Sequence, residues 1–397
     1  MNVTASFLLK VAELAFWFSA GAIVYAYLGY PLLLGVLAAF RRRVQTDPQF
    51  TLPVSVLISA YNEEESIGRK LAETLVLDYP ADKLEVLVVS DGSTDGTDEV
   101  VANFRDARVR LLRVEGRRGK TNAQNEGVKH CRGEVIVFSD ATAVYHPKSI
   151  RRLVARYADP KVGAVSGRYQ YFDSRGESPT GLGSIAFWNY ENLIKLFQGR
   201  ISTLTGCSGC IYSVRKCAYV PLPDDACSDL VEPLNIVRNG HRVAFADTAL
   251  AYEETTATTD QEFRMRVRVA TRGMRGVLSV PELLIPWRHP WTAFQLFSHK
   301  VFRWLVPVFL LVLFISSGIL SGHSGFLLFF ILQVLAYGVA ILALVVPIHR
   351  RWKVLGLPLF FCTLNAAALL SLIEVARGHK YTTWETVRNS RMEGKAA

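Results

Sequence analysis

Cysteine is scarce in this chain, with six residues in 397, and the spacing of the cysteines does not form a zinc site. Cys207 and Cys210 form one Cys-x-x-Cys pair, but Cys217 and Cys227 do not form a second tight pair. A structural zinc ion needs four closely spaced ligands, so we expect reduced thiols, as in a domain that faces the cytoplasm.

Acidic residues are also in deficit, with 35 Asp and Glu against 45 Lys and Arg and a formal net charge of +10. Arginines gather near residues 41–43, 264–275 and 349–351, a pattern typical of cytoplasmic loops that face anionic lipid. Because no basic stripe alternates with aromatic residues, we expect contact with membrane lipid and no nucleic-acid partner.

Charge is almost absent from residues 15–40, a run long enough to cross about 30 Å of hydrocarbon. The positive charge follows this run, whereas a signal peptide carries charge before a shorter run, so we expect a retained helix. Its amino terminus would lie outside the cell and Arg41 inside. Residues 281–297, rich in Trp, Phe and Pro, predict an interfacial segment. Three further spans are expected at residues 304–320, 326–348 and 355–373.

Four crossings would place the carboxyl terminus outside, yet the tail carries Arg377, Lys380, Arg388 and Arg391, which favour the cytoplasm. Either the last segment is re-entrant or the tail is exported against the charge rule. We expect an integral plasma-membrane protein with a cytoplasmic central domain. The expected division is a membrane helix at 1–45, the central domain at 46–280, the interfacial segment at 281–300, and membrane helices and tail at 301–397.

The central segment carries short β-branched runs about 25 to 30 residues apart, which is the spacing of βαβ units. The fold class predicted is therefore α/β, with a Rossmann-like and mostly parallel sheet. Strands are expected at 54–58, 84–89, 109–112, 135–138, 163–167 and 243–246. Helices are expected at 64–77, 94–104, 119–131, 148–157, 185–197 and 230–239.

Two of these strands end in an acid, Asp91 in Ser-Asp-Gly-Ser-Thr-Asp-Gly-Thr and Asp140 in Ser-Asp-Ala-Thr. Ligands of open α/β sheets bind in the crevice at the carboxyl ends of the strands, so both carboxylates should face one site. Between membrane helices, such a site indicates a nucleotide-activated molecule that is used at a membrane.

Four motifs in this order resemble those of inverting family 2 glycosyltransferases with a GT-A fold, from residue 54 to about 275. The resemblance extends to membrane-embedded synthases of the hyaluronan, chitin and poly-N-acetylglucosamine type. The motifs are Ser-Ala-Tyr-Asn-Glu-Glu at 59–64, the Asp91 run at 91–97, Gly-Lys-Thr-Asn-Ala-Gln-Asn at 119–125, and Ser-Asp-Ala-Thr at 139–142.

The resemblance implies a site for a UDP-sugar and a divalent cation, Mg²⁺ or Mn²⁺. Asp91 would hydrogen-bond the uracil and Lys120 would approach the base or the diphosphate. Asp140 would bind the cation, although a helix cap is the plain alternative for this residue. The family's second acid is here the neutral Thr142, whose hydroxyl could hold a metal-bound water. Two further residues, Ala60 and Glu63, would lie against the base.

For the acceptor side, the resemblance implies that Asp229 is the general base, with Asp225 as the fallback. A routine helix N-cap is the structural alternative for Asp229. Gly206 and Gly209 would form the glycine loop beneath the acceptor, because glycines let a backbone approach a sugar ring closely. Arg268 and Arg272 would offset diphosphate charge, unless they belong to a solvated or lipid-facing helix. The Arg-Trp pair associated with processive synthases is absent.

The predicted reaction is a direct displacement that inverts the anomeric carbon and adds a hexose or N-acetylhexosamine to a growing polysaccharide or lipid-linked glycan. A non-processive lipid glycosyltransferase is one alternative. A catalytically weak sugar-nucleotide-binding subunit is another. A transporter would use the polar Gln333, Asn365 and Glu374, but it would leave the soluble motifs without a role.

Overall fold

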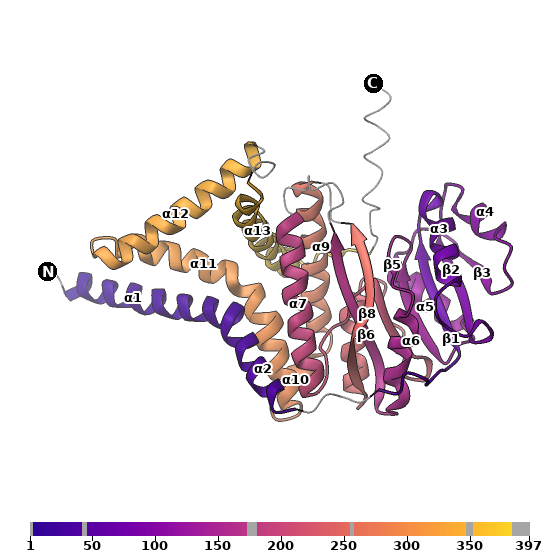
Figure 1. The fold of residues 1–397 in the computed structure, drawn as a ribbon. Helices are drawn as coiled ribbons and strands as arrows, with labels where there is room; N and C mark the ends of the chain where they lie inside the picture. Colours follow the sequence, from indigo (N-terminus) through magenta and orange to yellow (C-terminus); the bar gives the residue numbers. More distant parts are fainter. Residues whose placement is uncertain (1–2, 42–45, 173–180, 255–257, 347–351, 383–397) are drawn as a thin grey trace, which may run out of the picture.

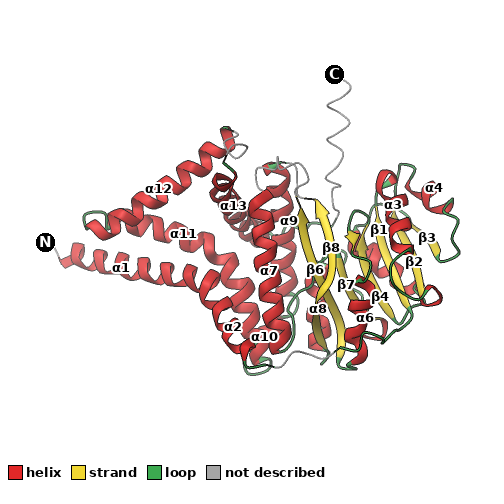
Figure 2. Cartoon of the chain, viewed as in Figure 1, coloured by secondary structure: helices red, strands yellow, loops and turns green. Residues whose placement is uncertain are grey.

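One eight-stranded sheet organises the central domain of the computed structural model, which describes residues 3–41, 46–172, 181–254, 258–346 and 352–382. The strand order is β3-β2-β1-β4-β7-β6-β8-β5. Helices cover both faces of the sheet, and the long apolar helices extend from one end of the domain (Figures 1 and 2). The strands are β1 (Val54–Ala60), β2 (Leu84–Asp91), β3 (Val109–Val114), β4 (Val135–Asp140), β5 (Val144–Tyr145), β6 (Val162–Phe172), β7 (Ile211–Arg215) and β8 (Arg242–Glu254).

The first half of the sheet is parallel, as predicted, with β3, β2, β1 and β4 side by side. All seven residues of β1 are buried, which is expected of a central strand covered on both faces. One face carries apolar residues of α3 (Glu64–Leu75), α4 (Thr97–Ala102) and α6 (Ser149–Val154). The other face carries those of α5 (Lys120–His130) and α8 (Ser228–Arg238).

The second half is mixed, because β7 runs antiparallel to both β4 and β6. Sequence reasoning placed β7 inside a glycine loop and missed the two-residue strand β5. The pairing matters for the site, since Ile211 at the start of β7 lies opposite Ser139 near the end of β4. The loop that precedes β7 therefore lies at the edge of the sheet where β2 and β4 end in Asp91 and Asp140.

Two long helices run across the side of the sheet domain that faces the apolar helices: α7 (Gly181–Ile201) and α9 (Thr259–Leu278). The helix predicted at 185–197 is thus longer at both ends. α9 was expected only as a region rich in arginine. Its first turn is capped by Thr258, whose hydroxyl accepts a hydrogen bond from the backbone N–H of Gln261.

In the described part of the chain, four helices are long and apolar enough to cross a membrane: Ser6–Ala39, Pro290–Ile319, Ser324–Val345 and Gly356–Ala376. The first joins α1 (Val3–Val24) and α2 (Tyr30–Ala39) through a π-helical turn. The second joins α10 (Pro290–Leu296) to α11 (Phe302–Ile319) through another, so part of the expected interfacial segment is continuous with a candidate span. The last two are α12 (Ser324–Val345) and α13 (Gly356–Ala376).

The last apolar helix, α13, packs along the sheet domain. Phe360 covers Gly183 of α7, and the hydroxyl of Ser371 donates to the carbonyl of Val267 in α9. Beyond α13, the ammonium of Lys380 lies 3.3 Å from a carboxylate oxygen of Asp225 in the sheet domain. The described part of the tail is therefore on the sheet-domain side. The structure does not describe three groups of the basic residues discussed above: 42–43, 349–351 and 388–391.

A buried charge cluster joins the sheet domain to the membrane helices. Glu191 of α7 forms an ion pair with Arg303 of α11, and its carboxylate also lies 3.3 Å from Nε2 of His299. Glu191 is 5% exposed, so removing one partner would leave an uncompensated buried charge.

We expect Glu191→Gln to lower the free energy of unfolding by about 3–5 kcal/mol, because Arg303 would lose its partner. The measurement is thermal unfolding of the full-length protein in detergent. The matched control is Asp260→Asn, since Asp260 and Arg264 form a pair whose side chains are 64% and 70% exposed. Breaking this exposed pair should cost less than about 1 kcal/mol. Equal stabilities of the two variants would contradict a structural role for the buried pair.

Candidate active site

The ends of three parallel strands meet at one edge of the sheet. In the β1–β4 register Ser59 pairs with Asp140, and in the β1–β2 register Ala60 pairs with Ser90, next to Asp91. Ala60 is fully buried at the end of β1. The strand ends thus bring Ala60, Asp91 and Asp140 together as the sequence predicted.

Asp91 is fully buried and holds a loop. Its two carboxylate oxygens accept hydrogen bonds from the backbone N–H groups of Arg118, at 3.0 Å, and Gly119, at 2.8 Å. Just after it, Gly92 has a φ of +68°, and a Cβ there would lie 2.9 Å from the carbonyl oxygen of Gly116. This geometry gives Asp91 the task of fixing the loop before α5. Its contact with uracil stays a prediction.

Glu63 ties two loops at the same edge. Its backbone N–H donates to the hydroxyl of Thr97 at 2.8 Å, and its carboxylate accepts from the hydroxyl of Ser66. The neighbouring Tyr61 lies under the guanidinium of Arg117, 4.2 Å from ring centroid to Cζ. Tyr61 belongs to the motif at 59–64, but the sequence did not reveal this aromatic–cation pair.

Lys120, the first residue of α5, connects the strand edge to the glycine loop. Its ammonium forms an ion pair with Asp140 and lies 3.4 Å from the carbonyl oxygen of Gly209. Burial alone would lower the pKa of Lys120, but the charge and hydrogen bond of Asp140 raise it above its ordinary value. The ammonium therefore stays charged where a diphosphate would bring negative charge.

Thr142 contacts a carboxylate that sequence reasoning missed. Its hydroxyl donates to Oε1 of Glu253 at 2.7 Å, and the hydroxyl of Tyr169 donates to the other oxygen. Burial raises the pKa of Glu253 and the charge of Asp140 raises it further. Glu253 lies 111 residues after Thr142 in the chain, so only the pairing of β5 with β8 reveals the contact.

The oxygen groups here fit a divalent cation such as Mg²⁺ or Mn²⁺. Asp140 and Glu253 offer carboxylates and Thr142 offers a hydroxyl, and both ions prefer hard oxygen ligands. In the described part of the chain no group of three or more His, Cys, Asp or Glu residues gathers as a closed metal site.

Asp229 lies against the glycine loop. Its backbone carbonyl accepts from the N–H of Cys207 at 2.7 Å, and its Oδ1 accepts from Sγ of Cys227 at 3.0 Å. A Cβ on Gly209 would lie 2.8 Å from Oδ2 of Asp229, whereas one on Gly206 would lie 3.9 Å from the backbone oxygen of Asp229. Both predicted loop glycines thus border Asp229. The N-cap of α8 is Cys227, and Asp229 is the acidic residue in the first turn of this helix.

The two acidic residues just before α8 form ion pairs. Asp224 pairs with Arg118 at 3.2 Å, and Asp225 lies 3.9 Å from Arg275 and 3.3 Å from Lys380. In the residues described, no ion pair of this kind involves Asp229.

Arg272 belongs to the wall of this site. Its guanidinium donates to the hydroxyl of Thr121 at 3.0 Å and to the carbonyls of Asp225 and Ala226. Arg268 is half-buried one turn earlier on α9, the spacing at which two residues share a helix face. The structure therefore places Arg272 next to α5, while a role for Arg268 stays a prediction.

Lys195 of α7 contacts the glycine loop, which the sequence did not reveal. Its ammonium donates to the hydroxyl of Ser208, inside the glycine loop, at 2.8 Å. Burial lowers the pKa of Lys195. The cysteines at both ends of this loop turn, Cys207 and Cys210, are buried free thiols, and burial raises the pKa of each.

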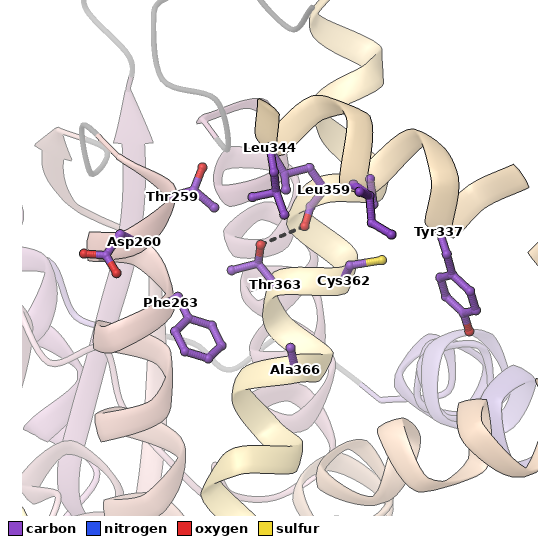
Figure 3. Close-up of a pocket in the computed structure, with 11 residues that line it drawn as sticks. Thr259, Asp260, Phe263, Tyr337, Leu344, Leu359, Cys362, Thr363 and Ala366 are labelled. Carbon is purple, nitrogen blue, oxygen red and sulfur yellow. Dashed lines mark hydrogen bonds between the residues drawn. The ribbon is translucent and has the colours of Figure 1, made fainter. Parts of the chain in front are cut away.

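A separate hollow of about 610 Å³ lies between α9, α12 and α13. Figure 3 shows Phe263 on one side and Leu344 and Leu359 on the other, with Thr363 donating to the carbonyl of Leu359. Most of its lining is apolar, so it does not suit a charged nucleotide sugar.

The sheet and its acid-ended strands have a GT-A fold. The fold of nearly the whole chain is similar to that of the mannosyltransferase PcManGT from Pyrobaculum calidifontis, solved with GDP-Man and Mn²⁺. The similarity has a TM-score of 0.67 at 22% identity and covers 92% of this chain and 98% of that one.

Residues 55–218 form a domain that matches the family model named Glycosyl transferase family 2. Two curated relatives are poly-beta-1,6-N-acetyl-D-glucosamine synthases. The protein of Staphylococcus aureus (strain COL) is 27% identical over 55% of this chain and 54% of its own length. The Staphylococcus epidermidis protein is 30% identical over 41% and 40%. The chain thus spans about half the length of the curated relatives it matches.

We expect Gly209→Ala to reduce sugar transfer about 100-fold with little loss of stability, because the added methyl group would displace the Asp229 carboxylate. Initial rates of the purified protein measure this effect. For comparison, a Cβ at Gly206 would meet Leu230 at an ordinary 3.4 Å, so Gly206→Ala should lose much less activity. Similar losses in the two variants would contradict the importance of the Gly209–Asp229 contact.

Proposed function

We propose that this protein is a membrane-bound, inverting glycosyltransferase that transfers a hexose or N-acetylhexosamine from a UDP-sugar to a glycan acceptor. The observation that carries the proposal is the contact of Asp229 with the loop at Gly209, whose carbonyl also contacts Lys120. The proton acceptor and the donor-binding residues thus border a single loop.

Asp229 acts as the general base in this mechanism. Its carboxylate accepts the proton of the acceptor hydroxyl, and the hydroxyl oxygen then attacks the anomeric carbon from the face opposite the leaving nucleotide. The attack forms the new glycosidic bond while the bond to the diphosphate breaks, so the anomeric configuration inverts. Gly206 and Gly209 leave space for the acceptor sugar beside this carboxylate.

Lys120 and Arg272 supply positive charge for the diphosphate, with Arg268 one turn away. Asp140 and Thr142 would hold Mg²⁺ or Mn²⁺, which supplies charge stabilisation for the departing diphosphate when it is bound. Ala60, Glu63 and Asp91 shape the pocket for the base. In this arrangement Asp91 acts through the loop that it holds at Arg118 and Gly119.

The acceptor we infer is a growing polysaccharide. Two curated relatives named for synthesis of a polysaccharide support this choice. The missing Arg-Trp pair supports the alternative, a single addition to a lipid-linked glycan. Product length distinguishes these two acceptors.

We also propose that the central domain and the tail face the cytoplasm. The contact of Lys380 with Asp225 keeps the tail on the sheet-domain side, and α13 packs along α9. In this orientation the helices that cross the membrane are α1–α2, α10–α11 and α12. Three crossings place the tail in the cytoplasm, the side that its positive charge favours. In this proposal α13 is the re-entrant or interfacial segment, and the plasma membrane is the site of action.

The direct test is transfer of labelled sugar from a panel of UDP-sugars and GDP-mannose by the full-length protein with Mg²⁺ or Mn²⁺. We expect Asp229→Asn to lower kcat by about 100-fold or more, because the base is lost. The matched control, Asp225→Asn, should keep most activity, since Asp225 is engaged by Arg275 and Lys380. Full glycan output by Asp229→Asn would instead favour a catalytically weak binding subunit.

A reporter fused after Ala397 tests the orientation. We expect green fluorescent protein at this position to fluoresce and alkaline phosphatase to be inactive, because both outcomes report a cytoplasmic terminus. The same reporters fused after Gly322, between α11 and α12, are the control and should give the opposite pattern. An active phosphatase at the carboxyl terminus would contradict the arrangement.

A further inference from the structure

The second position of the cation motif is neutral in this protein, but a carboxylate from another strand stands beside it. Thr142 donates its hydroxyl hydrogen to Oε1 of Glu253 at 2.7 Å. The contact is direct, so Glu253 lies one side chain away from the place where the family motif has an acid.

The pairing of β5 with β8 explains the position of Glu253. Tyr145 pairs with Ala251 and Val144 with Tyr252 in the antiparallel register of β5 and β8. Continuing the register by one residue brings Glu253 beside the turn that follows Asp140. On its other side β8 pairs with β6, where Gln170 lies opposite Tyr252 and Tyr171 opposite Glu253.

Hydrogen bonds hold Glu253 in place. Tyr169 donates a hydrogen bond to its second oxygen, which fixes the orientation of the carboxylate. In the part of the chain that the structure describes, no lysine or arginine is ion-paired with Glu253. Lys120 pairs with Asp140, and the ammonium of the nearby Lys70 donates to the carbonyl of Ala143.

We propose that Glu253 is a ligand of the divalent cation and replaces the acid that is missing at position 142. The cation would then be held by Asp140 from the end of β4 and by Glu253 from the end of β8, with Thr142 between them. Two carboxylates plus substrate phosphates form a ligand set that suits Mg²⁺ or Mn²⁺. The inference rests on the proposed function, because the cation site belongs to that proposal.

The test measures Mn²⁺ binding by the full-length protein in nanodiscs with saturating UDP, through the electron paramagnetic resonance signal of free Mn²⁺. We expect Glu253→Gln to weaken Mn²⁺ binding about 10-fold or more. Glutamine has the same shape and can still bond to Tyr169 and Thr142, so folding should persist. Glu254→Gln, a change at the adjacent exposed glutamate, is the matched control and should bind Mn²⁺ as the unmodified protein does.

A rescue variant separates ligation from a structural role. Thr142→Asp combined with Glu253→Gln moves the carboxylate to the family position, and we expect it to recover most of the Mn²⁺ affinity. Failure of this rescue, with Glu253→Gln binding weakly, would mean that Glu253 acts only by supporting the fold, and would overturn the proposal.

Asp140→Asn distinguishes failure of this inference from failure of the proposed function. If Asp140→Asn abolishes Mn²⁺ binding while Glu253→Gln leaves it unchanged, Glu253 is not a ligand and the proposed function stands. If neither change affects Mn²⁺ binding, the cation site itself is wrongly placed and both proposals fail.

Discussion

The ion pair between Lys120 and Asp140 is the interaction on which the site depends. It joins the first residue of α5 to the end of β4, and the same ammonium lies near the carbonyl of Gly209 in the loop before β7. Three chain segments thus meet at one charged contact. A partly buried ion pair keeps its attraction better than an exposed one, because water screens it less. The pair can therefore fix the position of α5 relative to β4 and to the loop before β7.

The antiparallel strand β7 gives this contact its geometry. Because Ile211 lies opposite Ser139, the preceding loop must run past Asp140 and reach the start of α8. Gly209 then approaches Asp229 so closely that no larger residue fits without displacing the carboxylate. Asp229 and Lys120 border the same loop because of this strand order, although they lie far apart in the chain.

The membrane helices form one body with the site through buried polar contacts. Glu191 and Arg303 link α7 to α11, while α9 carries Arg272 on one face and packs against α13 elsewhere along its length. The acceptor loop contacts the same helix α7 through Lys195 and Ser208. The glycine loop and Asp229 are thus joined through α7 to the long apolar helices.

The sequence by itself determined the α/β class and the parallel half of the sheet, and it supplied most of the candidate site residues. These features follow from local patterns: β-branched runs ending in Asp91 and Asp140, a glycine before Lys120, and long uncharged runs near the ends. Residues close in sequence carry this information, because hydrophobic periodicity and turn chemistry act over a few residues.

Only the tertiary structure decided the partners of those residues. Glu253 meets Thr142 because β8 pairs with β5, and Lys380 meets Asp225 because α13 packs along α9. Asp91 proved to hold a loop because the backbone of Arg118 and Gly119 folds over its buried carboxylate. Each contact joins segments 27 or more residues apart in the chain. Strand order and helix packing bring such segments together, and no local pattern in the sequence records either one.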